Sequence, residues 1–338
     1  MAQRTALITG ITGQDGGYLA QLLQAQGYRV VGLTRRTTAN ARDRLPEDVR
    51  SLELVSADLL DQGSLFGIVA QVQPDEVYNL AAQTFVPASW QQPILTAEVT
   101  GLGLARLLEA VRLLCPNARV FQASSSEMFG LAATSPQNEE TAFHPRSPYG
   151  TSKLYAHWIA TNYRESYGLF VASGIMFNHE SPRRGEEFVT RKISRAVARI
   201  AHGQETTLSL GNLDARRDWG YAPDFARAMH AMLQTQQPHD LVIATGKSHS
   251  VRDFCEIAFS QVGLDWQRHV TVDPSLFRPA EVDALVGDPS RAEQLLLWQP
   301  TLSFTDLVRE MVEADLDLLS ATPGSHFERT GSLLRTSR

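Results

Sequence analysis

Short apolar runs alternate with helical patterns through the first half of the chain. The apolar runs predict strands at 5–11, 29–34, 52–57, 76–81, 119–123 and 169–177. Apolar residues at helical spacing predict helices near 16–26, 62–72, 94–114 and 148–167. This alternation is typical of a parallel sheet with right-handed crossovers and helices on both faces. The predicted fold class is therefore α/β, with a Rossmann-type doubly wound parallel sheet.

The pattern becomes less regular after residue 178. Shorter elements at 188–202, 223–234, 250–262 and 303–319 are separated by loops rich in Arg, Glu and Pro. That composition predicts a smaller C-terminal α/β lobe that closes over a charged substrate. We expect a nucleotide-binding domain over 1–178, a mainly substrate-binding lobe over 179–320 with some segments returning to the first core, and a flexible tail over 321–338.

Composition excludes several classes of protein. A hydrophobic content of 43% and a charged content of 20% over 338 residues are those of an ordinary globular protein. A net charge of -6 argues against a nucleic-acid binder that depends on a basic face. No apolar run approaches the ~20 residues of a membrane helix, and no leader precedes the first strand, so we expect a cytoplasmic protein without membrane contact. Cys115 and Cys255 lie in apolar helical contexts and predict buried thiols, and no histidine spacing predicts a metal site.

A glycine-rich loop follows the first predicted strand and precedes a helix. Glycines allow close approach of the backbone to a pyrophosphate, and a helix N-terminus supplies N–H donors and positive charge. The spacing GxxGxxG departs from GxGxxG, and three glycines can also form a simple tight turn. Its place after the first strand favours cofactor contacts by Gly10, Ile11, Thr12, Gly13, Gln14, Asp15 and Gly16.

The ends of the next strands indicate which cofactor is bound. Arg35 and Arg36 stand where NAD-binding sheets carry a carboxylate, and two guanidiniums suit the 2′-phosphate of NADP. The alternative is a solvated basic turn. Asp58, followed by Leu59, is placed to meet the adenine edge or to cap the helix that starts near Gln62. The small residues after the fourth strand suit either the nicotinamide half or simple packing; the predicted contacts there are Leu80, Ala81, Ala82 and Gln83.

Tyr149 and Lys153 are one helical turn apart and share a face. An ammonium close to the phenol favours the phenolate, so we expect a lowered tyrosine pKa and a base for a sugar hydroxyl. The alternative is an amphipathic helix that carries this pair by chance. The nucleotide loop at the start of the same chain favours the catalytic interpretation.

Ser125 and Glu127 follow the fifth predicted strand, at the mouth of the expected cleft. Glu127 is the carboxylate in this position, and a carboxylate at the mouth of a cleft can act as a general base. The alternative is that Glu127 caps the next turn or faces solvent.

The chain resembles the extended short-chain dehydrogenase/reductases. Their TGxxGxxG loop, NLAA strand end and YxxxK pair occur here at 9–16, 79–82 and 149–153. Within that group the chain is similar to the GDP-mannose 4,6-dehydratase family over about residues 4–317. The long matching segments include 177–185, 188–192 and 211–220.

The resemblance implies an NADP-binding Rossmann domain with a GDP-sugar lobe. It also implies conversion of GDP-mannose, or a related GDP-manno-sugar, to a 4-keto-6-deoxy sugar by hydride transfer from C4 to C6. The implied catalytic residues are Ser125, Glu127, Tyr149 and Lys153. The implied cofactor contacts are Lys153, His179 and Arg184, and the implied contacts to the nucleotide sugar, besides Ser125, Glu127 and Tyr149, are Asn178, Val189, Lys192, Arg217, Arg278 and Glu281. A homodimer or homotetramer is expected.

Two departures and several alternatives accompany this resemblance. Ser125 stands where the family usually has Thr, and residues 37–50, which help to pair subunits in the family, match poorly. Without the resemblance, Arg217 could form a surface salt bridge and His179 could be a satisfied cleft histidine. The rival functions are a reductase or epimerase acting on a GDP-4-keto-6-deoxy sugar, and a non-catalytic NADP-binding regulator.

Overall fold

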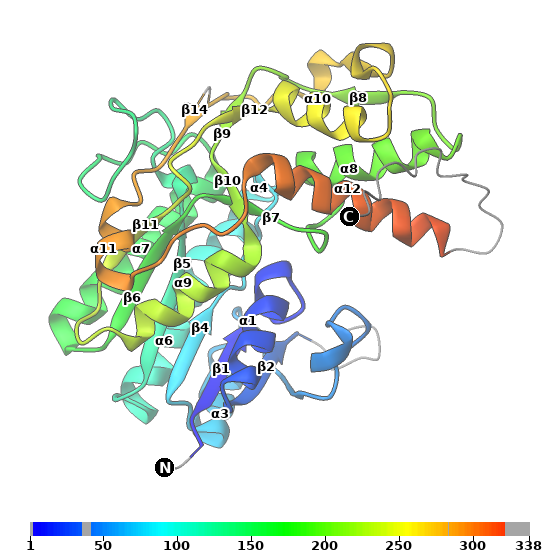
Figure 1. Ribbon diagram of the computed structural model, residues 1–338. Helices are drawn as coiled ribbons and strands as arrows, with labels where there is room; N and C mark the ends of the chain where they lie inside the picture. Colours follow the sequence, from blue (N-terminus) through cyan, green and yellow to red (C-terminus); the bar gives the residue numbers. More distant parts are fainter. Residues whose placement is uncertain (1–2, 36–41, 283, 322–338) are drawn as a thin grey trace.

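The computed structural model describes residues 3–35, 42–282 and 284–321. A seven-stranded sheet forms its centre, in the order β11-β6-β5-β4-β1-β2-β3 (Figure 1). All neighbouring strands in it are parallel. The strands are β1 (Thr5–Thr9), β2 (Arg29–Thr34), β3 (Glu53–Ser56), β4 (Glu76–Asn79), β5 (Arg119–Ser125), β6 (Val171–Met176) and β11 (Asp240–Ile243). The predicted α/β class is confirmed.

Helices cover both faces of this sheet because its strands are apolar on both sides. In β1, Ile8 faces one core and Leu7 faces the other, and both are fully buried. The core around Ile8 includes residues of α1 (Gln14–Ala25), α9 (Ala222–Gln234) and α11 (Ser290–Leu296). The core around Leu7 includes residues of α3 (Gln62–Val72), α6 (Gly103–Leu114) and α7 (Pro148–Tyr167).

The helix predicted over 94–114 is not one regular helix. It consists of α5 (Pro93–Thr96), a π-helical segment η2 (Ala97–Leu102) and α6, and it follows a short helix α4 (Val86–Gln91) that the sequence did not predict. The irregular segment packs closely on α7, since a Cβ on Gly101 would lie 3.2 Å from the ring of Tyr155. Glycine at this position therefore brings the two helices together.

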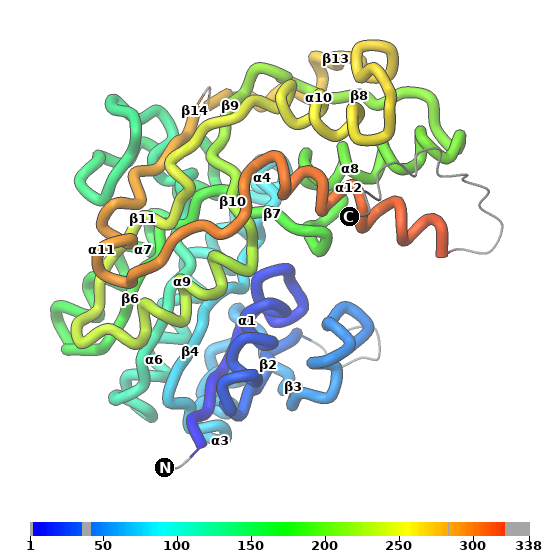
Figure 2. The backbone as a smooth tube through the Cα atoms, viewed as in Figure 1, coloured from blue at the N-terminus to red at the C-terminus, as the bar shows by residue number. Residues whose placement is uncertain are grey.

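Three helices form a second core beside the carboxyl ends of the sheet (Figures 1 and 2). They are α8 (Val189–Ala201), α10 (Val251–Gln261) and α12 (Phe304–Ser320), and they share an apolar cluster with Trp219. Arg191 of α8 and Asp315 of α12 form a buried ion pair, which Ser194 supports by donating a hydrogen bond of 2.7 Å to Asp315.

Small sheets and single turns make up further elements outside the main sheet. The pairs are β7 (Asn178–Glu180) with β10 (Trp219–Tyr221), and β8 (Leu208–Leu210) with β13 (Val270–Val272). A three-stranded sheet contains β12 (His249–Ser250), β9 (Arg216–Arg217) and β14 (Ala284–Leu285). The single turns are η1 (Glu47–Val49), η3 (Ser126–Met128), η4 (Trp266–Arg268) and η5 (Pro274–Leu276).

The division of the chain at residue 178 stays a prediction. β11 follows that point in sequence and still lies in the main sheet, next to β6. The tail expected over 321–338 falls outside the described residues except for its first position, and Arg36 also falls outside them. Within the described part of the chain, no helix is long and apolar enough to cross a membrane.

Candidate functional site

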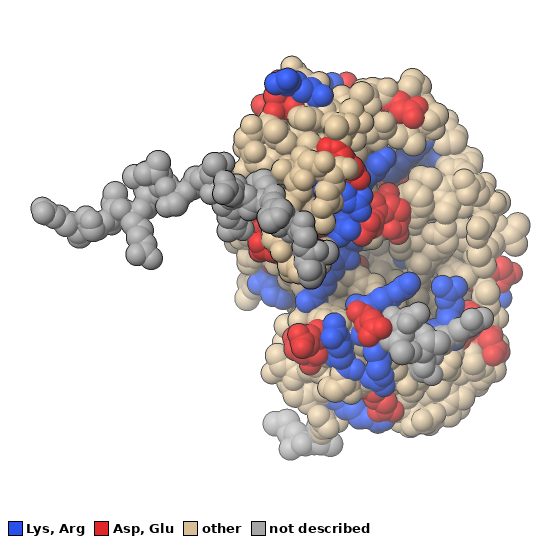
Figure 3. Space-filling view, turned by 90° about the vertical axis from the view of Figure 1, so that its right-hand side faces the viewer, with Lys and Arg blue, Asp and Glu red and all other residues tan. Residues whose placement is uncertain are grey.

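A cavity of about 640 Å³ opens at the carboxyl ends of the main sheet, against the second core that contains α8 and α10. Figure 3 shows a hollow on one face of the molecule, with Lys and Arg side chains gathered around it beside Asp and Glu side chains. Ligands of doubly wound sheets bind at this end of the strands. The predicted site residues that line the cavity are Asp15, Leu80, Ser125, Glu127, Tyr149, Lys153, Asn178, His179, Arg184, Val189, Lys192, Arg217, Arg278 and Glu281.

The start of α7 places Tyr149 and Lys153 in the cavity. Ser147 caps the helix by accepting a hydrogen bond of 3.0 Å from the backbone N–H of Gly150, and Pro148 occupies the first turn. Both features favour a helix that begins at this point. Tyr149 and Lys153 then follow one turn apart, and both are buried, with 7% and 4% exposure.

Burial governs the electrostatics of this pair. It raises the pKa of Tyr149 to about 12, with a hydrogen bond to Ser125 acting in the opposite direction. It lowers the pKa of Lys153 to about 8. The ammonium donates a hydrogen bond of 2.7 Å to the carbonyl of Ala123 and lies 5.8 Å from the centre of the Tyr149 ring. The expected lowering of the tyrosine pKa is therefore wrong for this structure.

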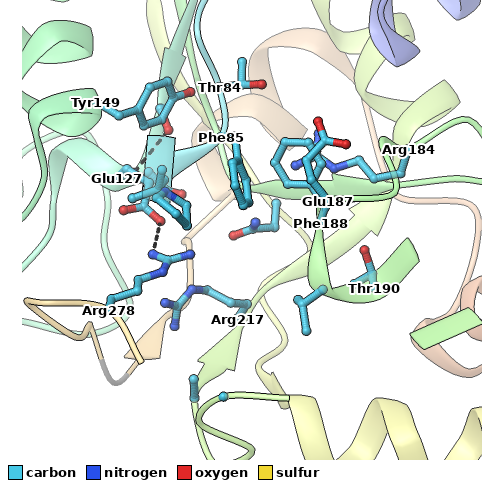
Figure 4. A pocket seen from close by; sticks show the side chains of 18 of the residues that line it. Thr84, Phe85, Glu127, Tyr149, Arg184, Glu187, Phe188, Thr190, Arg217 and Arg278 are labelled. Carbon is cyan, nitrogen blue, oxygen red and sulfur yellow. Dashed lines mark hydrogen bonds and ion pairs between the residues drawn. The ribbon is translucent and has the colours of Figure 1, made fainter. Parts of the chain in front are cut away.

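Ser125 and Glu127 lie where β5 passes into η3. The hydroxyl of Ser125 accepts a hydrogen bond of 3.2 Å from the backbone N–H of Glu127 and so caps this turn. The side chain of Glu127 is 11% exposed and forms an ion pair of 3.1 Å with Arg278 (Figure 4). The alternative in which Glu127 caps the turn or faces solvent is wrong.

The glycine loop has the geometry of a nucleotide cradle. Gly10 has a φ of +72°, and a Cβ there would lie 2.8 Å from the backbone nitrogen of Ala81. A Cβ on Gly16 would lie 2.6 Å from the carbonyl oxygen of Gly10. No side chain caps the N-terminus of α1, where Gly13 is the N-cap. The residues therefore fit a group that approaches the backbone closely and carries negative charge.

Asp15 and His179 form a pair at the inner end of this loop. Nε2 of His179 lies 2.9 Å from Asp15, and Nδ1 lies 2.7 Å from the carbonyl of Phe177. Burial acts to raise the pKa of Asp15, but His179 and its hydrogen bond outweigh it and hold that pKa at about 2. Burial lowers the pKa of His179, and the carboxylate of Asp15 more than restores it. Both ring nitrogens have partners, so His179 is satisfied while it lines the cavity.

The remaining predicted cofactor contacts lie outside the cavity lining. Arg35 is exposed directly after β2. Asp58 accepts a hydrogen bond of 3.0 Å from the backbone of Leu60, whereas Asp61 is the N-cap of α3. The capping role considered for Asp58 is therefore wrong. The other members of this group surround the loop or the strand ends: Gly10, Ile11, Thr12, Gly13, Gln14, Gly16, Leu59, Ala81, Ala82 and Gln83.

Residues that follow β7 in sequence contribute cations to the cavity wall. Arg217 is 6% exposed, and its guanidinium donates to the carbonyls of Arg216 and Val282 at 2.8 Å each. The alternative of a surface salt bridge for Arg217 is therefore wrong. Lys192 donates a hydrogen bond of 2.7 Å to the carbonyl of Ser209. Glu281 accepts a hydrogen bond of 2.7 Å from the backbone N–H of Arg278.

Sequence reasoning missed an aromatic pair in the wall of the cavity. The rings of Phe85 and Phe188 meet edge to face with centres 5.8 Å apart, and both residues line the cavity (Figure 4). The guanidinium of Arg184 lies 3.6 Å from the centre of the Phe188 ring and pairs with Glu180 at 3.2 Å. The available signal was proximity, since Phe85 and Phe188 closely neighbour predicted site residues in sequence.

Sequence comparison agrees with this geometry. The model of a family described as GDP-mannose 4,6 dehydratase matches residues 7–311. The chain is 51% identical over 328 residues to GDP-mannose 4,6 dehydratase 1 of Arabidopsis thaliana, covering 94% of this chain and 91% of the relative. It is 47% identical over 350 residues to GDP-mannose 4,6 dehydratase of Homo sapiens, covering 96% of this chain and 94% of that relative.

A solved structure supports the fold alone. The chain superposes on the structure of RMD from Pseudomonas aeruginosa complexed with NADPH with a TM-score of 0.78 and 23% sequence identity. The match covers 93% of this chain and 100% of that one.

Proposed function

The chain belongs to the GDP-mannose 4,6-dehydratase family and is a hydro-lyase, and we propose the following roles for its residues. The observation that carries the proposal is that Ser125, Glu127, Tyr149 and Lys153 all line one cavity. The reaction removes water from GDP-mannose in three stages: oxidation at C4, elimination across C5 and C6, and return of the hydride at C6.

We propose a bound nicotinamide cofactor, specifically NADP, which supplies the reversible hydride acceptor and a positive charge. The residues proposed to hold its pyrophosphate are those of the loop 10–16, at the N-terminus of α1. Arg35 and Arg36 would hold the 2′-phosphate, and the exposed position of Arg35 after β2 supports its share of this role. The remaining proposed contacts are Asp58, Leu59, Leu80, Ala81, Ala82, Gln83, Lys153, His179 and Arg184.

Tyr149 takes the proton of the C4 hydroxyl as the hydride leaves C4. Its raised pKa keeps the phenol protonated in the buried site, so positive charge must be close when it acts as a base. The neighbouring hydroxyl of Ser125 acts to lower the pKa of the phenol and so favours the phenolate. Lys153 keeps α7 docked on β5 through the carbonyl of Ala123 and supplies further positive charge.

Glu127 takes the proton from C5. The ketone formed at C4 acidifies this C–H bond, whose electron pair moves toward the carbonyl oxygen. The resulting enolate expels the C6 hydroxyl, which takes the proton held by Glu127 and leaves as water. The bound cofactor would supply the hydride for C6, and the proton that Tyr149 took from the C4 hydroxyl would return to C5. The buried position of Glu127 in the cavity wall supports this role.

The C-terminal lobe holds the nucleotide part of the substrate in this proposal. Arg217 and Arg278 bind the diphosphate, because guanidiniums pair well with phosphate oxygens. Glu281 accepts hydrogen bonds from the nucleoside. Asn178, Val189 and Lys192 complete the contacts to the nucleotide sugar, and their places in the cavity lining support this.

We also propose a cytoplasmic homo-oligomer, a homodimer or homotetramer. Apolar side chains on adjoining helices support it: Ile94 is 76% exposed in α5 and Trp158 is 53% exposed in α7. Since α5 and α7 are in contact, these exposed apolar residues lie on adjoining helices, where a second copy of the chain could cover them.

One assay tests the proposed function. Purified protein is mixed with GDP-mannose and NADP, and the masses of the nucleotide sugars are measured by mass spectrometry. The expected product is lighter than the substrate by one water, with no net change in NADPH. A reductase would instead leave the mass of GDP-mannose unchanged. It would cause net oxidation of NADPH when a 4-keto sugar is supplied.

A further inference from the structure

The ion pair between Glu127 and Arg278 joins the two halves of the cavity. Oε1 of Glu127 and Nη1 of Arg278 are 3.1 Å apart (Figure 4). Glu127 belongs to η3, directly after β5, whereas Arg278 lies in the loop after η5. The two side chains are 11% and 30% exposed, so the pair lies in the cavity wall and not on the open surface.

The contact with Glu127 uses only part of the N–H donors of the Arg278 guanidinium. A guanidinium carries several N–H groups in a planar fork. Within the described residues, the hydrogen bond to Glu127 is the only one that this guanidinium makes. The loop itself is held separately, because the backbone N–H of Arg278 is bonded to the carboxylate of Glu281 at 2.7 Å. The guanidinium can therefore turn to a second anion while its loop keeps its shape.

This ion pair opposes the proton transfer proposed for Glu127. Taking the C5 proton neutralises Glu127 and leaves the guanidinium of Arg278 in the cavity wall without its counter-ion, which is costly in a partly buried position. A diphosphate brings negative charge to the same wall, where Arg217 also lies. The arrival of that group supplies Arg278 with a new counter-ion and removes the cost.

We propose that Glu127 and the diphosphate of the substrate compete for Arg278, so that nucleotide binding releases the base for its reaction. The role of the released base rests on the proposed function, whereas the competition itself concerns binding alone. Arg278 is then a positioning residue for the C5 step: the C5–H bond breaks, an O–H bond forms on Glu127, and the electron pair moves to the C4 carbonyl. Part of the binding free energy of the nucleotide is thereby used to lower the barrier of proton transfer from C5.

A double-mutant cycle on GDP binding tests the competition. GDP is titrated calorimetrically into the wild-type protein, Glu127→Gln, Arg278→Met and the double variant. Glu127→Gln is expected to bind GDP at least about fivefold more tightly than wild type, the lower end of typical coupling between sites. In the Arg278→Met background the same change is expected to alter the affinity by less than about twofold. Arg278→Gln serves as a second variant if Arg278→Met does not fold.

A matched control separates this coupling from a general loss of negative charge. Glu187 also lines the cavity, and it has no hydrogen bond to Arg278 among the described residues. Glu187→Gln should change GDP affinity equally with and without Arg278. Equal effects of Glu127→Gln in both backgrounds, or no effect in either, would overturn the proposal. The protein could show the expected coupling between Glu127 and Arg278 in GDP binding and still fail to dehydrate GDP-mannose. That result would overturn the proposed function and leave the competition standing.

Discussion

Gly150 of α7 lies directly against the backbone of Glu127: a Cβ on Gly150 would sit 2.6 Å from the carbonyl oxygen of Glu127. This approach sets the separation between the helix that carries Tyr149 and the turn that carries Glu127. The two groups proposed to act in successive steps on one sugar are therefore held at a distance that only glycine permits here.

Gly150→Ala should force these elements apart. We expect a loss of about 1–3 kcal/mol in the free energy of unfolding, typical of overpacking a tight contact. The turnover rate should fall at least about tenfold, because small displacements of catalytic groups are costly. Unfolding by denaturant and the rate at saturating GDP-mannose measure the two effects.

Gly67 in α3 is the matched control, since nothing lies within 4 Å of a Cβ placed there. Gly67→Ala should leave turnover unchanged and stabilise the helix by up to about 1 kcal/mol. Equal behaviour of the two variants would show that the contact between Gly150 and Glu127 does not matter.

Glu127→Gln should separate oxidation from elimination. The amide keeps the size of the side chain but cannot take the C5 proton, so dehydration should slow by about 10²–10⁴-fold. Oxidation at C4 uses Tyr149 and should continue, so bound NADP becomes reduced and stays reduced after GDP-mannose is added. Absorbance of the reduced cofactor and product mass, followed in a single turnover, measure the two steps.

Tyr149→Phe provides the contrast, because it removes the base for the C4 hydroxyl. It should suppress reduction of the cofactor itself by a similar factor. Turnover of Glu127→Gln at nearly the wild-type rate would assign the carboxylate a structural role only.

Lys153→Met should stabilise the protein while it abolishes activity. The pKa of Lys153 is lowered from 10.5 to about 8 by burial, so the unfolded chain binds this proton more tightly than the folded protein does. Lys153 therefore costs stability at neutral pH, and the cost shrinks as pH rises between the two values. The difference corresponds to roughly 3 kcal/mol, less about 1 kcal/mol for the hydrogen bond to Ala123, so we expect a gain of about 2 kcal/mol.

Denaturant unfolding near neutral pH and near pH 10.5 checks this prediction. The gain should be present in the first condition and absent in the second. A variant less stable than wild type near neutral pH would show that the ammonium is stabilised by more than its bond to β5.

Replacement of Arg35 and Arg36 by Gln should weaken NADP far more than NAD. Only NADP carries the 2′-phosphate with which these guanidiniums would pair. Equilibrium titration of both cofactors measures the ratio, and we expect NADP affinity to fall by at least about tenfold, with NAD affinity almost unchanged. Equal losses for both cofactors would remove the basis for the NADP assignment.

Local sequence signals predicted the elements that carry most of the site. Ser147 and Pro148 are residues typical of a helix start. The structure has α7 over Pro148–Tyr167, which matches the predicted helix at 148–167. The strand ends were similarly readable from apolar runs followed by small residues. The π-helical turn in η2 was not, because it depends on the fit of Gly101 against α7.

Electrostatic relationships could not be read from the sequence. Glu127 and Arg278 are 151 positions apart, and the sequence next to either residue does not predict their contact. The spacing of Tyr149 and Lys153 suggested a lowered tyrosine pKa, but burial by the surrounding fold raises that pKa. The ammonium of Lys153 is bonded to the carbonyl of Ala123. Asp58 and Asp61 are similar in type, and only the fold shows which one caps α3.

Deuterium placed at C4 of GDP-mannose tests the central claim most directly. The account states that the hydride removed from C4 returns to C6 of the same sugar while Glu127 handles only the C5 proton. Mass spectrometry and NMR of the product should therefore find the deuterium in the C6 methyl group, with no labelled NADPH released. Deuterium lost to water or released on free NADPH, or a C6 methyl group without the label, would contradict the account.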